Sequence, residues 1–63
     1  MKNNLKVLRA MHDMTQQQLS ERAGVSRQTI NSIETGRYIP STELALKLSA
    51  IFGKTVNEIF QLD

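Results

Sequence analysis

The 63-residue sequence predicts an all-α fold of five short helices. Three observations lead to this prediction. Apolar residues recur three or four positions apart, which is the spacing of one helix face. Asparagine, serine or threonine precedes the apolar stretches and suits a helix start, while the three glycines follow such stretches and suit helix ends. No segment shows the alternation of apolar and polar residues that marks a strand.

The first expected helix covers about residues 5–13. Asn3 or Asn4 is its cap, because a side-chain oxygen there can accept a hydrogen bond from an unpaired backbone N–H group. Its apolar residues at helical spacing are Leu5, Leu8 and Met11.

Residues 15–36 are predicted to form two short helices joined by a tight turn. Thr15 and Gln18 make a capping box, in which each side chain bonds the other residue's backbone amide, and this box opens the second helix. Gly24 follows that helix, and a glycine adopts the left-handed backbone of such a turn without steric cost. Ser26 then caps the third helix.

The fourth expected helix begins at its cap Ser41 and ends at Gly53. A second capping box, formed by Thr55 and Glu58, opens a short fifth helix. Five helices leave both ends of the chain free, so a short two-strand pairing of the N-terminus with residues 61–63 is compatible with the sequence, which does not decide it. The apolar face of the fourth helix consists of Leu44, Leu48, Ile51 and Phe52.

Composition excludes several classes of function. The chain has no cysteine, so we expect neither a disulfide framework nor a thiolate metal site. His12 has no second ligand type beside it, and no nucleophile–base spacing or glycine-rich phosphate loop is present, so we expect no metal, no cofactor, no small-molecule ligand and no enzymatic activity. No apolar run approaches the roughly 20 residues of a membrane span, and no signal peptide is visible, so a cytoplasmic protein is expected.

The charge of the chain is unevenly distributed. The formal net charge is +2. Residues 1–37 hold six basic and three acidic side chains, whereas residues 38–63 hold two basic and three acidic ones. The half that contains the two-helix segment is therefore the basic half, as attraction to phosphate requires. Uneven scatter by chance is the alternative.

The third expected helix, residues 27–35, divides into an apolar and a polar face at about 100° per residue. Ile30 and Ile33 fall on the apolar face. The polar face carries arginine, glutamine, asparagine and serine, which are residue types that bind base edges in the major groove. An ordinary solvated face is the alternative, although such faces usually favour lysine and glutamate, and this one has neither. The residues expected to contact bases are Arg27, Gln28, Asn31 and Ser32.

Glu34 falls near the apolar face of the same helix, where an unpaired carboxylate would be costly. Arg9 lies on the inner edge of the first helix, one turn after Leu5. We therefore expect a buried Arg9–Glu34 ion pair that joins the first helix to the third.

The spaced residues of this segment resemble the helix-turn-helix of the phage repressor/Cro type, or XRE family. The resemblance extends over nearly the whole chain and implies a five-helix, lambda-repressor-like DNA-binding domain over residues 1–63, with the helix-turn-helix at 15–36. The residues that carry it are Gln16-x-x-Leu19-x-x-x-Ala23-Gly24-Val25-Ser26-x-x-x-Ile30-x-x-x-Glu34-x-Gly36.

The resemblance also implies roles for individual residues. The position of Gln16 contacts phosphate in the family, and the loop after the third helix approaches phosphate. The base-reading positions vary between members, so Arg27 can equally bind a phosphate, which carries no sequence information. The expected phosphate contacts are Thr15, Gln16, Thr29, Thr35, Arg37 and Tyr38.

Apolar residues crowd the last eight positions of the chain. Some must close the core, and the remainder would form an exposed apolar patch that suggests a partner. A two-fold dimer through the fifth helix and the tail would place two modules about 34 Å apart, on half-sites one DNA turn apart. Closure of the core by all of them is the alternative. The residues expected at the dimer interface are Val56, Ile59, Phe60 and Leu62.

Together these features indicate a sequence-specific transcriptional regulator that binds a palindromic operator in double-stranded DNA as a homodimer. A repressor is expected because the 63 residues contain no effector or activation domain. An antitoxin-type protein-interaction module of the same fold is the alternative. The absence of a disordered toxin-wrapping extension weighs against that alternative.

Overall fold

The computed structural model, which describes residues 1–63, contains five helices and two short strands. The all-α fold predicted from the sequence is confirmed, and the pairing of the two ends, which the sequence left open, is present. The helices are α1 (Leu5–Met11), α2 (Gln16–Ala23), α3 (Arg27–Glu34), α4 (Thr42–Phe52) and α5 (Val56–Ile59), and the strands are β1 (Lys2–Asn3) and β2 (Phe60–Gln61).

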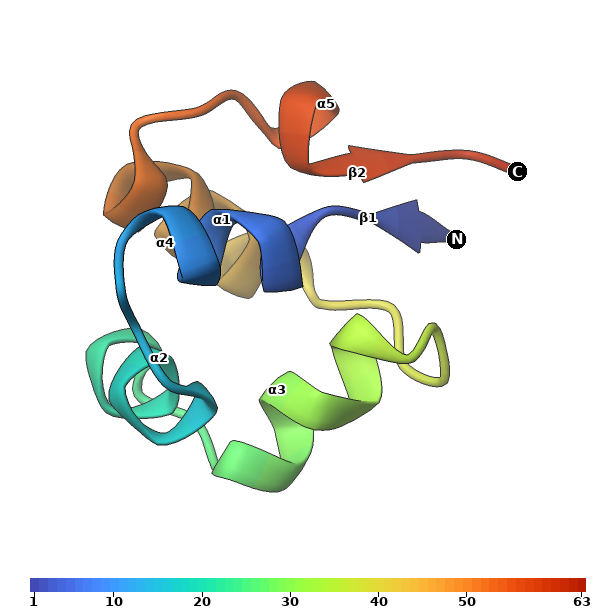
Figure 1. The fold of residues 1–63 in the computed structure, drawn as a ribbon. Coiled ribbons are helices and arrows are strands. Elements are labelled where there is room, and N and C mark those ends of the chain that lie inside the picture. The colour runs from blue at the N-terminus through green and yellow to red at the C-terminus, as the bar shows by residue number, and fades with distance from the viewer.

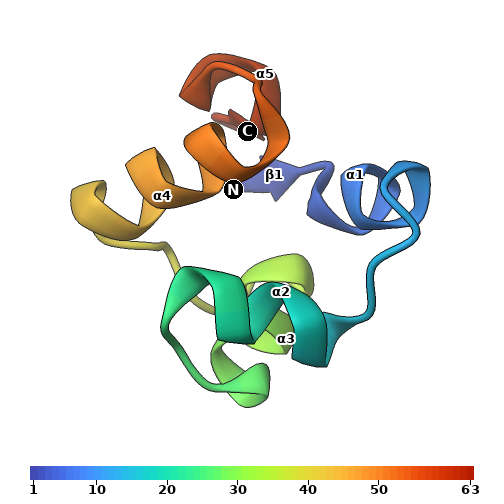
Figure 2. The same cartoon turned by 90° about the vertical axis from the view of Figure 1, so that its left-hand side faces the viewer.

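The helices form three levels (Figure 1). α2 and α3 lie together at the bottom of the view, α1, β1 and α4 lie above them, and α5 with β2 is at the top. The view turned by 90° shows the same order (Figure 2). α3 therefore lies at the outside of the molecule, far from α5. No helix is both long enough and apolar enough to cross a membrane.

Four of the helices begin at hydroxyl caps, as the sequence predicts. In each case the cap oxygen accepts a hydrogen bond from the backbone N–H three residues later. At α5 the bond is reciprocal, because the backbone N–H of Thr55 donates to Glu58 Oε1 at 2.9 Å. This bond from the Thr55 backbone lowers the pKa of Glu58, and hydrogen bonding with the Thr55 side chain lowers it further by a smaller amount. The four caps are Thr15, Ser26, Ser41 and Thr55.

The first helix begins at the expected residue and ends two residues earlier than expected. Asn4 occupies the cap position but makes no capping bond; instead the side-chain oxygen of Asn3 accepts from the backbone N–H of Leu5 at 3.1 Å. The helix ends at Met11, and Asp13 adopts a left-handed backbone with φ of 55°. Met11 is 70% exposed. Three residues fall about 60° short of a full helical turn, so each step of three shifts the side chain by about 60° around the helix axis. Met11 is two such steps from Leu5, so it points about 120° away from Leu5 and misses the core.

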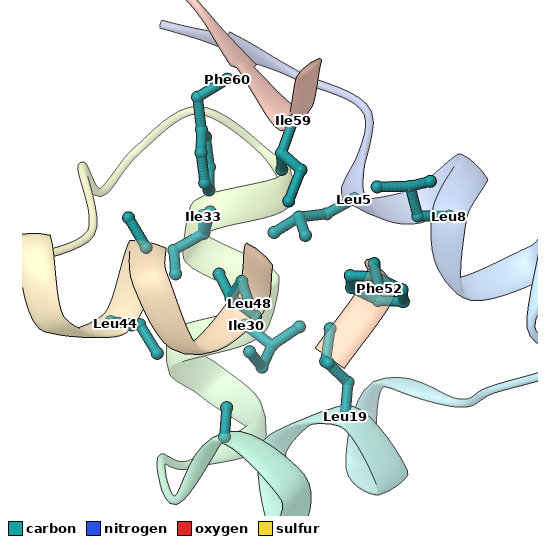
Figure 3. Packing of buried hydrophobic residues seen from close by; sticks show 12 residues of the cluster. Leu5, Leu8, Leu19, Ile30, Ile33, Leu44, Leu48, Phe52, Ile59 and Phe60 are labelled. Atoms are coloured by element: carbon teal, nitrogen blue, oxygen red, sulfur yellow. The ribbon is translucent and has the colours of Figure 1, made fainter. Parts of the chain in front are cut away.

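Every helix contributes to the hydrophobic core, which contains 12 buried residues (Figure 3). Ile30 and Ile33 enter it from α3, as the helical wheel predicts. Leu5 and Leu8 enter from α1, and Leu19 from α2. The inner face of α3 is thus fixed by packing, and its polar face is turned outward.

Ile59 and Phe60 also belong to this core, with 0% and 8% of their surface exposed. The expectation that they form a dimer interface is therefore wrong for Ile59, and Phe60 retains only a small exposed edge. The reason is the length of α5, which has only four residues. A helix of one turn cannot present one apolar face inward and a second outward, so its large side chains close the core.

The paired ends of the chain also hold the end of α3. The strands pair antiparallel, with Lys2 opposite Gln61 and Asn3 opposite Phe60. The side-chain nitrogen of Asn3 donates to the carbonyl oxygen of Ile33 at 2.9 Å. The same carbonyl oxygen also accepts from the backbone N–H of Gly36 at 3.0 Å, so Asn3 adds a second bond at the end of α3.

Candidate nucleic-acid interface

The two-helix segment has the predicted geometry. α2 and α3 are joined by a turn in which Gly24 has φ of 72°, in the left-handed region. Leu19 and Ala23 on α2 and Ile30 on α3 are buried in the same core. The two helices are therefore rigidly placed, with the polar face of α3 exposed beside the first turn of α2.

A polar hollow lies between the start of α2 and the outer face of α3. No hydrophobic residue and no acidic residue lines it. The donor groups of its α3 side chains bond to nothing within the chain, so they are available to a ligand in the hollow. The structure thus brings together all four residues that were expected to contact bases. The lining residues are Gln16, Arg27, Gln28, Asn31 and Ser32.

Arg9 and Glu34 form an ion pair behind this hollow. Arg9 Nε lies 2.5 Å from Glu34 Oε2, and Arg9 Nη2 lies 3.0 Å from Glu34 Oε1. Both side chains are largely buried, with 13% and 6% of their surface exposed. Arg9 also donates to the carbonyl oxygen of Met14 at 3.1 Å. The pair therefore ties α1, the loop after it and the end of α3 together.

Gln16 takes part in this network through its side-chain amide. Its amide nitrogen donates to Glu34 Oε1 at 3.0 Å and to Asn31 Oδ1 at 3.2 Å. These two bonds use both amide hydrogens, so the side chain has none left for a phosphate. The backbone N–H groups of Gln16 and Gln17 lie in the first turn of α2 and have no helical partner. An anion at this helix start would be bound by these backbone groups.

The other residues expected to contact phosphate fall into two groups. Arg37 and Tyr38 are exposed, and the polar groups of their side chains bond to nothing in the chain. Thr15 keeps its hydroxyl hydrogen because its oxygen only accepts. The remaining two hydroxyls are occupied by hydrogen bonds at the two ends of α3. Thr35 donates to the carbonyl oxygen of Asn31 at 2.9 Å, and Thr29 bonds the cap hydroxyl of Ser26 at 2.9 Å.

Comparison with known proteins agrees with this geometry. A family model described as helix-turn-helix matches residues 5–59. The chain belongs to the helix-turn-helix family of transcriptional regulators. The family consists of DNA-binding regulators and not of enzymes. The five-helix, lambda-repressor-like fold described above is the fold of this family.

Similar helix-turn-helix proteins occur in archaea and bacteria. An uncharacterized HTH-type transcriptional regulator of Methanocaldococcus jannaschii is 52% identical over 60 residues, which cover 95% of this chain and 91% of that protein. The uncharacterized HTH-type transcriptional regulator YgzD of Bacillus subtilis is 44% identical over 63 residues, which cover 100% of this chain and 96% of that protein. A third regulator, from Archaeoglobus fulgidus, is 41% identical over 63 residues.

Two features of this helix-turn-helix protein were not anticipated from the sequence. One is the bond from Asn3 to the end of α3, and the other is the bond from Gln16 to Asn31. In both cases the partners are far apart in the chain, so no local pattern signals them. The only sequence signal was the polar character of Asn3 next to a helix start, which suggested a cap and not a second partner.

Proposed function

We propose that this helix-turn-helix protein is a sequence-specific DNA-binding repressor and that α3 lies in the major groove of its operator. The observation that carries the proposal is the polar hollow, where donor groups on α3 face outward with no acidic residue beside them. Arginine binds guanine O6 and N7, and glutamine binds adenine N6 and N7. The buried faces of α2 and α3 fix the relative positions of the two helices that carry these side chains.

Phosphate contacts on both sides of α3 would position the helix. The unpaired backbone N–H groups at the start of α2 lie on one side, and Arg37 and Tyr38 lie in the loop after α3. Contacts of this type set the register on DNA without reading sequence. A domain bound to an operator occupies DNA that a competing protein would otherwise bind. This steric competition supports repression as the proposed outcome.

Gln28→Ala and Arg37→Ala test the division between base reading and phosphate contact. Gln28→Ala should weaken the specific site by about 1–3 kcal/mol and leave random DNA nearly unchanged. Arg37→Ala should weaken both and reduce the salt slope by about one. A mobility-shift assay on the protein's own upstream DNA at two salt concentrations measures both effects. Equal losses on specific and random DNA for both variants would refute the assignment.

We further propose that two copies associate through an apolar groove that begins at Ile39, in the loop between α3 and α4. Its most exposed residues are Ile39 and Leu46, which are 67% and 59% exposed. A single α3 reads only a few base pairs, and a two-fold axis beside its end would place a second α3 about 34 Å away, in the next turn of DNA. From the set expected in the sequence, Val56 and the edge of Phe60 line this groove. Leu62 is exposed beyond it.

Leu46→Glu tests the dimer. A buried, unpaired carboxylate in the interface should shift the protein to a monomer and weaken binding to a palindromic operator, while binding to one half-site remains. Sedimentation equilibrium at micromolar concentration and mobility shifts on both DNAs measure this. Val7→Glu is the control, because Val7 is similarly exposed, at 56%, on α1. A wild-type protein that is monomeric on a palindromic operator would contradict the proposal.

A further inference from the structure

We propose that Gln16 fixes the orientation of the Asn31 amide and so determines which bases α3 accepts opposite Asn31. The inference rests on the proposed binding of α3 in the major groove. Gln16 is then a positioning residue and Asn31 is the residue that reads the base. Gln16 belongs to α2, so this part of the specificity comes from outside α3.

The orientation follows from a chain of hydrogen bonds whose direction is set at its buried end. Arg9 can only donate, and the ionised Glu34 can only accept. The Gln16 atom that lies 3.0 Å from Glu34 Oε1 must therefore be the nitrogen. The same nitrogen lies 3.2 Å from the Asn31 side chain, so the atom facing it must be Asn31 Oδ1. The Arg9 guanidinium thus determines which atom donates and which accepts in every hydrogen bond of this series.

The Asn31 side chain therefore has a fixed orientation of its amide oxygen and nitrogen. Its side-chain oxygen is held by Gln16 of α2, and its amide nitrogen, on the opposite side of the amide group, donates to no group in the protein. An amide in this orientation offers hydrogen-bond donors to the DNA. Guanine, adenine and thymine each present an acceptor in the major groove, whereas cytosine presents the N4 amino group, which is a donor. We therefore expect the base opposite Asn31 to be any base except cytosine.

Without the bond from Gln16, the exposed Asn31 amide can rotate by 180°. Its oxygen would then accept from cytosine N4, and the discrimination would be lost. The neighbouring Gln17 has no such effect on α3, because its amide donates to Glu21 on the exposed side of α2 at 3.1 Å. Gln17→Ala is thus a matched control, since it removes the same side chain from the same helix turn.

The test measures binding to the operator with each of the four bases at each position. The position read by Asn31 is the one at which Asn31→Ala abolishes base preference. There the wild type and Gln17→Ala should disfavour cytosine by about tenfold or more. Gln16→Ala should lose this discrimination and keep its preferences at the other positions. Full retention of the cytosine penalty in Gln16→Ala would overturn the inference.

Asn31→Asp is a second variant for the same test, and it leaves the Arg9–Glu34 pair intact. It can therefore be measured even if Gln16→Ala impairs folding. Its carboxylate still accepts from Gln16, but it offers only acceptors to the DNA, so the preference at this position should reverse toward cytosine. An unchanged preference would overturn the inference. Absence of any base preference in the wild type would overturn both the inference and the proposed function. A wild-type preference that neither Gln16→Ala nor Asn31→Asp changes would overturn the inference alone.

Discussion

Arg9→Ala is expected to lower the free energy of unfolding by about 3–5 kcal/mol, because it leaves the buried Glu34 carboxylate without its charged partner. Glu34 is 6% exposed, and Gln16 would be its only remaining partner. A 63-residue domain has a total stability of about 3–9 kcal/mol. The substitution should therefore remove a large part of the stability and sharply lower the melting temperature. Arg9→Lys should cost less, since it retains the charge without the paired N–H groups.

Urea unfolding of the single variants and of Arg9→Ala/Glu34→Ala measures this interaction. The double variant should lose much less stability than the sum of the two single variants, because no unpaired charge remains buried. Arg22→Ala is the control, since Arg22 is an exposed arginine in the last turn of α2. An unchanged melting temperature in Arg9→Ala would rule out a structural role for the pair.

Ile59→Ala should lower the free energy of unfolding by about 2–5 kcal/mol, because it opens a cavity where a fully buried side chain now packs. The loss should not depend on protein concentration, since Ile59 lies within the core of one chain. A residue of a dimer interface would behave differently, because its loss would shift an association equilibrium and change with concentration.

Leu62→Ala provides the comparison three residues further along the chain. Leu62 is 89% exposed, so its truncation should change stability by no more than about 0.5 kcal/mol. Thermal unfolding of both variants at two protein concentrations separates the two roles. A concentration-dependent loss in Ile59→Ala would show that this residue stabilises an association and not the core.

The sequence by itself determined the features that depend on neighbouring residues. Each hydroxyl cap lies three residues from the amide that it accepts from, and Gly24 lies where the chain must turn, so local spacing is sufficient to place α2 and α3. The helical wheel separated Ile30 from Gln28 for the same reason. The partner of Glu34 was also predictable, because a carboxylate beside an apolar face needs a cation and Arg9 was suitably placed at the inner edge of the first helix.

Only the tertiary structure decided how the remaining side chains are used. Ile59 and Met11 are both apolar residues near a helix end, yet one is fully buried and the other is exposed, because burial depends on which elements pack over each position. Gln16 bonds Asn31 and Glu34 across the gap between α2 and α3. A side-chain hydrogen bond between residues 15 or 18 positions apart depends on how two helices dock, and packing of the whole core sets that docking.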